Sequence, residues 1–281
     1  MAKNYRIKTC VNFLNLTRYT DNITSVCLLI KINDTIAILN KNNIKIDYAY
    51  FQKSNHCDDY GILFSSIIPG ILQQELIKDK ELKVIGYLQN DNVVYLSKET
   101  KLSYCYYDFI WHSSLTSFIQ INPHTSQQLH QLVSETIFKN KQYNLYCLGG
   151  EMGIYSKYFG NNYDSVKCIT DCKSLYDDYL YNNHHQNNCY LVDYKKIILE
   201  NIINTTNNIL IVNISRKGLG ELSKQILSLE NGFKQIIYIG CQHDSVNNDL
   251  LILKEKYKVD RIIKLNQFPQ TNHYLYFVSL F

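Results

Sequence analysis

The feature that most constrains the fold is a regular alternation of apolar runs and helical patterns after residue 120. Apolar residues recur with a helical period over 125–138, behind Pro123, and short apolar runs then alternate with helical segments up to the C-terminus. This alternation predicts a parallel, doubly wound sheet, which binds ligands at the carboxyl ends of its strands. The predicted strands are 143–147, 165–170, 189–192, 209–214, 235–240, 261–265 and 274–280, and the further helices are 152–158, 174–182, 194–203, 220–229 and 245–256.

The first 110 residues have a different texture. Their short apolar runs are broken by polar turns, which predicts a small α+β or mostly β region. We therefore expect two domains, residues 1–115 and 116–281. The strands predicted in the first domain are 26–32, 35–39, 44–50, 82–88 and 92–96, with one short helix at 71–77.

Charge and cysteine usage narrow the functional class. The formal charge of +4 (29 basic minus 25 acidic side chains) permits a polyanionic partner without requiring one. The nine cysteines include no CxxC pair, which favours neither a disulfide framework nor a structural metal site. Because no apolar run reaches the roughly 18 residues of a membrane helix, we expect no membrane partner. The cysteine pattern and a start, MAKNYRIKTC, that lacks an apolar signal stretch predict a reducing, cytoplasmic location.

Two aspartates follow predicted strands downstream of a glycine turn. The stretch NLYCLGGEMG (144–153) is a strand, a glycine-containing turn and the start of a helix, where backbone N–H groups can approach a ligand. Asp171 ends the next strand and can accept two ribose hydroxyls, while Asp193 ends a further strand and can accept an adenine amino group. Both are equally the residue type that caps helix N-termini, so both interpretations stay open.

A cysteine also follows a predicted strand. In IYIGCQHDS the apolar run ends at a glycine, and Cys241 stands in the polar turn that follows. This position suits a nucleophile at the mouth of an α/β sheet, because a reactive thiolate needs access and a lowered pKa. A small apolar residue that finishes a strand is the alternative.

Two further groups of residues have both a structural and a functional interpretation. The run His56–Asp59 contains metal-binding residue types, but four adjacent polar residues cannot all face one ion, so a loop is expected and no metal is predicted. The aromatic residues around Trp111 could stack a nucleobase, or could form a core between domains.

Five motifs in a fixed order resemble the uracil-C5 RNA methyltransferases, which make 5-methyluridine in transfer and ribosomal RNA. The resemblance covers 117–281 and implies a class I methyltransferase-type sheet there, preceded by the family's central, RNA-contacting type of domain. The N-terminal oligonucleotide-binding barrel of the family is expected to be missing, which would make the chain a degenerate member. The motifs are SFIQINP (117–123), NLYCLGG (144–150), ISRKGL (214–219), YIGCQHDS (238–245) and QFPQTNH (267–273).

The resemblance also implies a chemistry. Members attack C6 of a flipped-out uracil with a cysteine thiolate, methylate C5 from S-adenosylmethionine, and then lose the C5 proton to a base. Cys241 matches the position of the nucleophile. Gln120, Tyr146, Asp171 and Asp193 match the positions that hold the cofactor.

Several positions depart from the family pattern. Leu275 stands where the proton-abstracting glutamate is expected, and leucine cannot accept a proton. Asn213 replaces a carboxylate that should meet the uracil, and Leu148 replaces the first glycine of the cofactor loop, where its side chain is expected to crowd the backbone. His243 or Asp244 could take over the proton transfer, although a surface hydrogen-bonded pair is the simpler interpretation.

These departures favour an RNA-binding protein of the family with impaired or lost catalysis and a role in binding or assembly. Transfer or ribosomal RNA is the expected partner, together with a possible protein partner. One alternative is an active S-adenosylmethionine-dependent enzyme that uses Cys241. The other is a protein–protein scaffold on the same fold.

Overall fold

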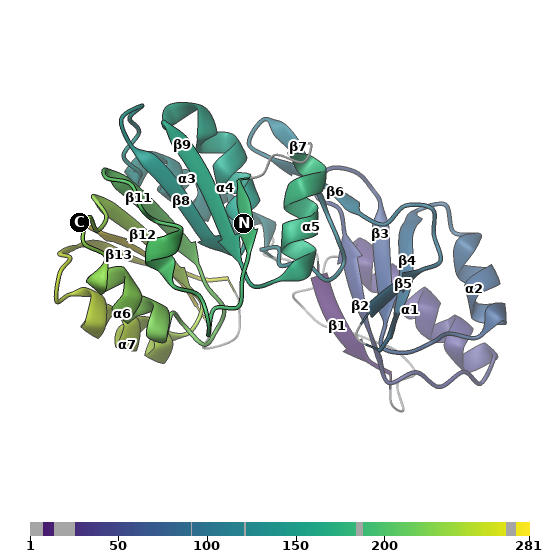
Figure 1. Cartoon of the computed structure of the whole chain (residues 1–281). Coiled ribbons are helices and arrows are strands. Elements are labelled where there is room, and N and C mark those ends of the chain that lie inside the picture. The colour runs from purple at the N-terminus through teal and green to yellow at the C-terminus, as the bar shows by residue number, and fades with distance from the viewer. Residues whose placement is uncertain (1–7, 14–25, 91, 121, 184–187, 268–273) are drawn as a thin grey trace. The chain divides into compact units, whose positions relative to one another are not determined.

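The computed structural model describes residues 8–13, 26–90, 92–120, 122–183, 188–267 and 274–281. The chain divides into two compact units, an N-terminal unit (Met1–Ser117 with Ile121–His124) and a C-terminal unit (Phe118–Gln120 with Thr125–Phe281). Figure 1 shows each unit built around its own sheet. Each unit is described separately below.

The C-terminal unit contains a seven-stranded sheet in the order β10-β9-β8-β11-β12-β14-β13. The first five strands of that order are parallel, and β14 is antiparallel to both of its neighbours. The predicted doubly wound sheet is therefore confirmed, and strands 165–170 and 235–240 begin and end as expected. The strands are β8 (Asn144–Gly149), β9 (Ser165–Thr170), β10 (Cys189–Leu191), β11 (Asn208–Asn213), β12 (Gln235–Gly240), β13 (Val259–Leu265) and β14 (Leu275–Leu280).

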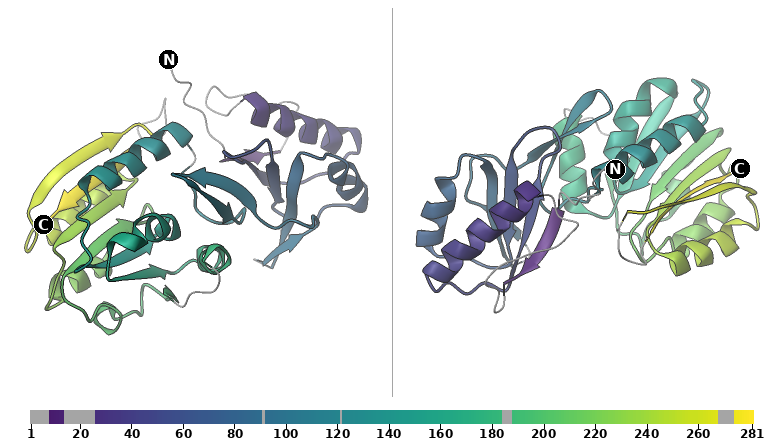
Figure 2. Two further views of the ribbon diagram at one scale, coloured as in Figure 1. Left: turned by 90° about the horizontal axis from the view of Figure 1, so that it is seen from above. Right: turned by 180° about the vertical axis from the view of Figure 1, so that it is seen from behind.

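Helices cover both faces of this sheet (Figure 1 and Figure 2). Successive residues of β8 point to opposite faces, so Leu145 and Cys147 enter one core while Tyr146 and Leu148 enter the other. The first core also takes side chains from α3 (Pro123–Thr136), α4 (Met152–Phe159) and α5 (Lys173–Asn182). The second takes side chains from α6 (Glu221–Ser228) and α7 (His243–Leu253). Because both faces are buried, the parallel strands read as continuous apolar runs.

One predicted helix of this unit, 194–203, is absent. The structure forms a single 3₁₀ turn there, η2 (Leu199–Asn201). The side chain of Gln225 in α6 accepts a hydrogen bond from the Leu199 N–H (2.9 Å) and donates one to the Ile197 carbonyl (3.0 Å). These backbone groups are satisfied by a neighbouring helix, so the segment does not need to become a helix itself.

The N-terminal unit contains a five-stranded sheet in the order β1-β2-β3-β4-β5 and a separate two-stranded sheet, β6-β7. Helices α1 (Val26–Lys41) and α2 (Gly70–Ile77) belong to this unit. The α+β alternative of the sequence prediction is the one that the structure adopts. The strands are β1 (Lys8–Asn12), β2 (Tyr48–Lys53), β3 (Tyr60–Phe64), β4 (Leu82–Gln89), β5 (Asn92–Tyr95), β6 (Leu102–Tyr106) and β7 (Phe109–Ser113).

The two strands predicted at 26–32 and 35–39 are wrong, because α1 spans both. Its buried residues are Leu28, Ile32, Thr35, Ile36 and Leu39, which recur every three to four residues along one face of a helix. The β-branched residues of this segment suggested strands. Packing of the apolar stripe against the sheet outweighs that weak local preference.

The other candidate groups of the N-terminal unit have structural roles. Trp111 in β7 is 6% exposed and belongs to the core. In the 56–59 loop, the Ser54 hydroxyl accepts hydrogen bonds from the N–H groups of His56 (3.0 Å) and Cys57 (3.1 Å). Across the described residues, the structure holds no cluster of three or more His, Cys, Asp or Glu side chains that could bind a metal ion. No helix of the described ranges is long and apolar enough to cross a membrane.

Candidate ligand-binding edge of the parallel sheet

A tight glycine turn lies at the carboxyl end of β8, in the middle of the parallel sheet. Gly149 has φ of +92°, and a Cβ placed on it would lie 2.9 Å from the carbonyl carbon of Asn213 and closer still to its oxygen. The N–H of Gly150 donates to that oxygen at 2.7 Å. Only glycine fits this approach of β8 to β11, and the turn leaves backbone groups at an edge where parallel sheets bind ligands.

The sequence predicted that the Leu148 side chain would crowd this turn, and it does not. Its side chain is 1% exposed and lies in the core with Ile169 and Val212. The turn begins one residue later, at Gly149, and Phe118 covers Gly150, where an added Cβ would lie 2.7 Å from the Phe118 ring. The tight glycine turn at Gly149 and Gly150 therefore forms even though residue 148 is a leucine.

A buried carboxylate follows the turn. Glu151 precedes α4, and its side chain is 0% exposed. Its Oε2 accepts a hydrogen bond from Asn213 Nδ2 (3.3 Å) and lies 3.6 Å from His130 Nε2, whereas its Oε1 has no hydrogen-bond partner. This places an acid, an amide and an imidazole, from three separate segments, at one end of the sheet.

A buried pair of amides lies in the same unit. Gln120, 2% exposed, accepts a hydrogen bond at Oε1 from Nε2 of Gln267 (2.8 Å). The second polar atom of each amide, Nε2 of Gln120 and Oε1 of Gln267, has no partner. Gln120 is two residues from Phe118, which contacts Gly150, so its unpaired donor is carried by the segment that covers the glycine turn. Buried amide atoms without partners are the kind of group that a bound ligand satisfies.

Asp171 and Asp193 lie close enough to repel each other. Each follows the end of a strand, β9 and β10 respectively, and both side chains are exposed. Partial desolvation raises the pKa of Asp171, and the negative charge of Asp193 raises it further. The pKa of Asp193 is lowered, mainly because its Oδ1 accepts a hydrogen bond from the Lys195 N–H (3.0 Å).

The capping role predicted for both aspartates therefore applies to Asp193 and not to Asp171. Asp193 caps its own turn through that bond to Lys195, while the residue that caps α5 is Cys172, not Asp171. The Asp171 carboxylate makes no cap to α5 and stands at the carboxyl edge of the sheet.

Tyr146 lies away from this edge. Its ring is fully buried, packs against Phe233 and is approached by Lys167, and its hydroxyl pairs with the Thr205 hydroxyl at 2.9 Å. Thr205 precedes β11 and bonds to Asn208 at the start of that strand, so the Tyr146 hydroxyl lies near the amino ends of the strands.

Cys241 follows β12 directly and is half-buried, packed against the same core as α3 to α5. Burial raises the pKa of its thiol, and the positive charge of Arg216 lowers it by less. At neutral pH the group is therefore mainly a thiol. The sheet order places β11, and hence Asn213, between the strand that leads to Glu151 and the strand that leads to Cys241.

The positions that should supply a base differ in burial. Leu275 begins β14, is 2% exposed and pairs across the sheet with Leu265, so it is a core residue. His243 and Asp244 begin α7, and their side chains are 64% and 85% exposed and 3.2 Å apart. His243 Nε2 also lies 3.1 Å from the Asn247 amide. The pair has the geometry of a surface hydrogen-bonded pair. His273 and the FPQT motif lie outside the described residues.

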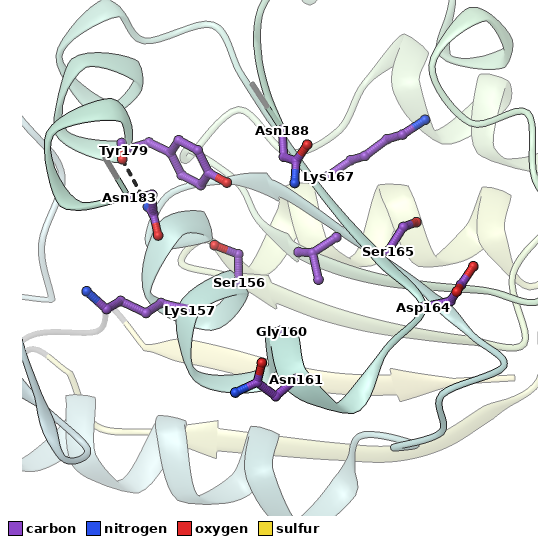
Figure 3. Close-up of a pocket in the computed structure, with 11 residues that line it drawn as sticks. Ser156, Lys157, Gly160, Asn161, Asp164, Ser165, Lys167, Tyr179, Asn183 and Asn188 are labelled. Carbon is purple, nitrogen blue, oxygen red and sulfur yellow. Dashed lines mark hydrogen bonds between the residues drawn. The ribbon is translucent and has the colours of Figure 1, made fainter. Parts of the chain in front are cut away.

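The structure also contains a hollow of about 440 Å³ elsewhere in the C-terminal unit (Figure 3). It is lined by Ser165, the first residue of β9, by Asn188, which precedes β10, and by Tyr179 of α5. Ser165 and Asn188 lie at the amino ends of β9 and β10. The ammonium groups of the two lysines in its wall bond to backbone carbonyls of Asn182 and Ile202. The hollow is therefore separate from the edge that carries Glu151 and Cys241.

Sequence analysis missed Glu151, His130 and Gln267. The glutamate follows two glycines at a predicted helix start, which is a signal for a carboxylate beside the turn. His130 carried no usable signal, since one histidine on the predicted helix 125–138 has no distinguishing spacing. Gln267 lies in the QFPQTNH motif, but its hydrogen-bond partner, Gln120, is 147 residues away.

The strand order, the helices on both faces and the glycine turn after the first parallel strand define a class I methyltransferase-type fold. Three comparisons with known proteins place the chain within this class. Residues 191–280 match the family model described as tRNA (Uracil-5-)-methyltransferase. The crystal structure of Pyrococcus abyssi tRNA (uracil-54, C5)-methyltransferase, in complex with S-adenosyl-L-homocysteine, is similar with a TM-score of 0.71 at 15% identity, covering 99% of this chain and 76% of that chain.

Two sequence relatives are similar over parts of the chain. A protein of Leptospira interrogans named as an uncharacterized RNA methyltransferase is 25% identical over 234 residues, which is 75% of this chain and 56% of the relative. A tRNA/tmRNA (uracil-C(5))-methyltransferase of Shewanella amazonensis is 35% identical over 66 residues, 24% of this chain and 17% of the relative. Residues 191–280 therefore resemble the uracil-C5 RNA methyltransferases, and the relatives that match more of the chain are named as RNA methyltransferases. The chain spans about half the length of the curated relatives that it matches over most of its sequence.

Proposed function

We propose that the chain binds RNA and S-adenosylmethionine and methylates C5 of a uracil, with Cys241 as the nucleophile. The observation that carries this proposal is the position of Cys241 at the carboxyl edge of the sheet that also bears the glycine turn and the Asp171 carboxylate. Transfer and ribosomal RNA are the substrate classes that the family suggests. A reducing interior suits the chain, because all nine cysteines are free.

The residues present fit the cofactor. The Gly149 turn brings backbone groups close to a ligand, and the unpartnered Nε2 of Gln120 is a hydrogen-bond donor for its amino-acid part. Asp171 and Asp193, at the ends of β9 and β10, are acceptors for the ribose hydroxyls and the adenine amino group. We assign Tyr146 to the support of β8, since its hydroxyl bonds to Thr205. When bound, S-adenosylmethionine supplies the methyl group.

The chain's own residues account for the remaining steps. The uracil leaves the base stack, because its C6 cannot be reached inside a helix. Cys241 loses its proton to solvent, aided by the charge of Arg216. Its sulfur then bonds to C6, and the electrons of the C5–C6 double bond move to C5, which becomes a nucleophile. After C5 has gained the methyl group it still carries its proton. Removal of that proton restores the C5–C6 double bond and breaks the C6–S bond.

One observation favours a second candidate, an RNA-binding member with impaired or lost catalysis and a binding or assembly role. Leu275 is a core residue, so nothing at that position accepts the C5 proton. In this case the chain binds RNA, and cofactor binding is weak or abolished. A partner protein would then use the chain as a subunit.

Three measurements on the full chain test these functions. Titration calorimetry with S-adenosylmethionine measures cofactor binding. Incubation with RNA that contains 5-fluorouracil tests addition, because C5 then has no removable proton and the adduct persists on a denaturing gel. Cys241→Ser should abolish the adduct, whereas Cys105→Ser, at an exposed cysteine of the N-terminal unit, should not. Conversion of uridine to 5-methyluridine, followed by nucleoside analysis, measures turnover.

The outcomes separate the candidates. Cofactor binding, a Cys241-dependent adduct and 5-methyluridine support the enzyme. Salt-dependent RNA binding without cofactor binding or adduct refutes the enzyme and supports the binding subunit. If the chain binds neither RNA nor cofactor, both candidates fail, and a protein–protein scaffold is what remains.

A further inference from the structure

Glu151 is an outlier in both backbone conformation and environment. Its φ of 55° lies in the left-handed region, and three of the five described non-glycine residues with positive φ are asparagines, which tolerate it. Such a conformation costs about 1–3 kcal/mol and persists at sites where the surrounding structure imposes it. The same residue has a fully buried carboxylate, so strain and burial coincide at one position.

The carboxylate is also incompletely satisfied. Oε2 has the Asn213 amide at 3.3 Å and the His130 ring at 3.6 Å, and Oε1 has no partner. A carboxylate oxygen accepts hydrogen bonds readily, so an unsatisfied one in a buried site carries a desolvation penalty of about 1–3 kcal/mol. Glutamine or alanine at this position would avoid that penalty, so the buried acid is a candidate for a chemical role.

The location of this acid suits a reacting base. Asn213 ends β11, and Glu151 and Cys241 follow the strands on either side of it. Neighbouring strands are spaced by about 4.8 Å, so the backbone of β11, which ends at Asn213, runs one strand spacing from β12, which leads to Cys241. Asn213 is the residue to which Glu151 is hydrogen-bonded. A uracil joined through C6 to the sulfur of Cys241 would present its C5 beside that strand end. A general base must lie within about 3 Å of the proton it takes, which one side chain can span from there.

We propose that Glu151 is the proton acceptor of the release step, in place of a base at position 275. This inference rests on the proposed methylation by Cys241. Oε1 of Glu151 takes the proton from methylated C5, and the electrons of the C5–H bond form the C5–C6 double bond. The C6–S bond breaks, and its electron pair leaves with the sulfur of Cys241. Asn213 and His130 hold Oε2, so that Oε1 is the oxygen that receives the proton.

The test uses Glu151→Gln in the full chain, with ordinary uracil-containing RNA and S-adenosylmethionine carrying a labelled methyl group. Glutamine has the same shape and can still accept from Asn213, but it does not accept a proton at neutral pH. The variant should transfer the methyl group once and then remain joined to the RNA. A labelled protein–RNA complex should persist on a denaturing gel, and turnover should fall by about a hundredfold to ten-thousandfold.

Two controls make the test specific. Glu135→Gln makes the same chemical change on the exposed side of α3 and should turn over normally. In the double variant Glu151→Gln with Asn213→Asp, the acid moves to the other side of the hydrogen bond between residues 151 and 213. This double variant should recover part of the turnover, and its trapped protein–RNA complex should disappear, because a carboxylate is again present at the strand end.

The results are decisive in each direction. Turnover of Glu151→Gln within about threefold of the parent refutes the role of Glu151. Loss of cofactor affinity or of the 5-fluorouracil adduct in that variant also refutes it, because the residue would then act before the release step. If the parent chain itself forms no adduct with 5-fluorouracil RNA, the proposed function fails, and the inference fails with it. Thermal unfolding of each variant shows whether it is folded.

Discussion

A substitution of Gly149 by alanine tests the physical basis of the ligand-binding edge. Two costs are expected. A positive φ disfavours any residue with a Cβ by about 1–3 kcal/mol. Gly220→Ala, at φ of +54° with no atom within 4 Å of the added Cβ, should show this backbone cost alone. At Gly149 the Cβ would also lie 2.9 Å from the carbonyl carbon of Asn213, which forces β8 and β11 apart.

That separation breaks the hydrogen bond from Gly150 to Asn213, worth about 0.5–1.5 kcal/mol, and it strains two central strands. We expect Gly149→Ala to lose about 3–5 kcal/mol, a large part of the 5–15 kcal/mol that holds a typical domain folded. Gly220→Ala should lose only the backbone cost of about 1–3 kcal/mol.

Urea unfolding followed by circular dichroism measures both losses, and hydrogen exchange of β8 and β11 amides locates them. The single tryptophan, Trp111, is in the N-terminal unit, so its fluorescence does not report on this sheet. If Gly149→Ala is within 1 kcal/mol of Gly220→Ala, the close approach of the two strands does not control the turn. Cofactor affinity of Gly149→Ala should fall in parallel with its stability.

Three further predictions follow from single groups. The rate at which iodoacetamide alkylates Cys241 should rise about tenfold per pH unit to beyond pH 9, because burial raises the pKa of the thiol above its ordinary 9.0 and the thiolate is the reactive form. Arg216→Gln should slow the alkylation further at each pH, because a positive charge that lowers this pKa is lost. A plateau of the rate below pH 8 would contradict this prediction. Asp249→Ala removes the buried acceptor of the Tyr238 hydroxyl (2.7 Å) and of two backbone N–H groups, and should lower the unfolding free energy by about 2–4 kcal/mol in urea. Asp171→Asn should weaken S-adenosylmethionine binding by about ten- to a hundredfold in calorimetry without changing the melting temperature, and equal affinity would remove Asp171 from the site.

The candidate site was only partly readable from the sequence. Asp171 and Cys241 could be placed because each directly follows a buried strand, and the ends of parallel strands share one edge. The roles given to them stay predictions. Tyr146 shows the limit of this approach: its position in β8 is as expected, but its hydroxyl bonds to Thr205 at the other end of the sheet. Which way a long side chain leans depends on the partner it finds.

Two wrong predictions of secondary structure also arose because a partner from another element was not visible in the sequence. The segment 26–41 contains enough β-branched residues to resemble strands, and the sheet surface beneath it makes it a helix. The segment 194–203 has a helical pattern, and the side chain of Gln225 satisfies its backbone instead. In both places a partner from another element outweighed a preference of less than about 1 kcal/mol per residue.

The sequence by itself determined that the second half of the chain is a doubly wound sheet, and it placed a cysteine and an acid at the ends of two strands. Apolar periodicity and strand ends are local properties, so neighbouring residues encode them. Tertiary structure alone decided that Glu151 meets Asn213, 62 residues away, and that Leu275 is buried in the core. Those contacts depend on strand order and register across the sheet, which no local pattern specifies.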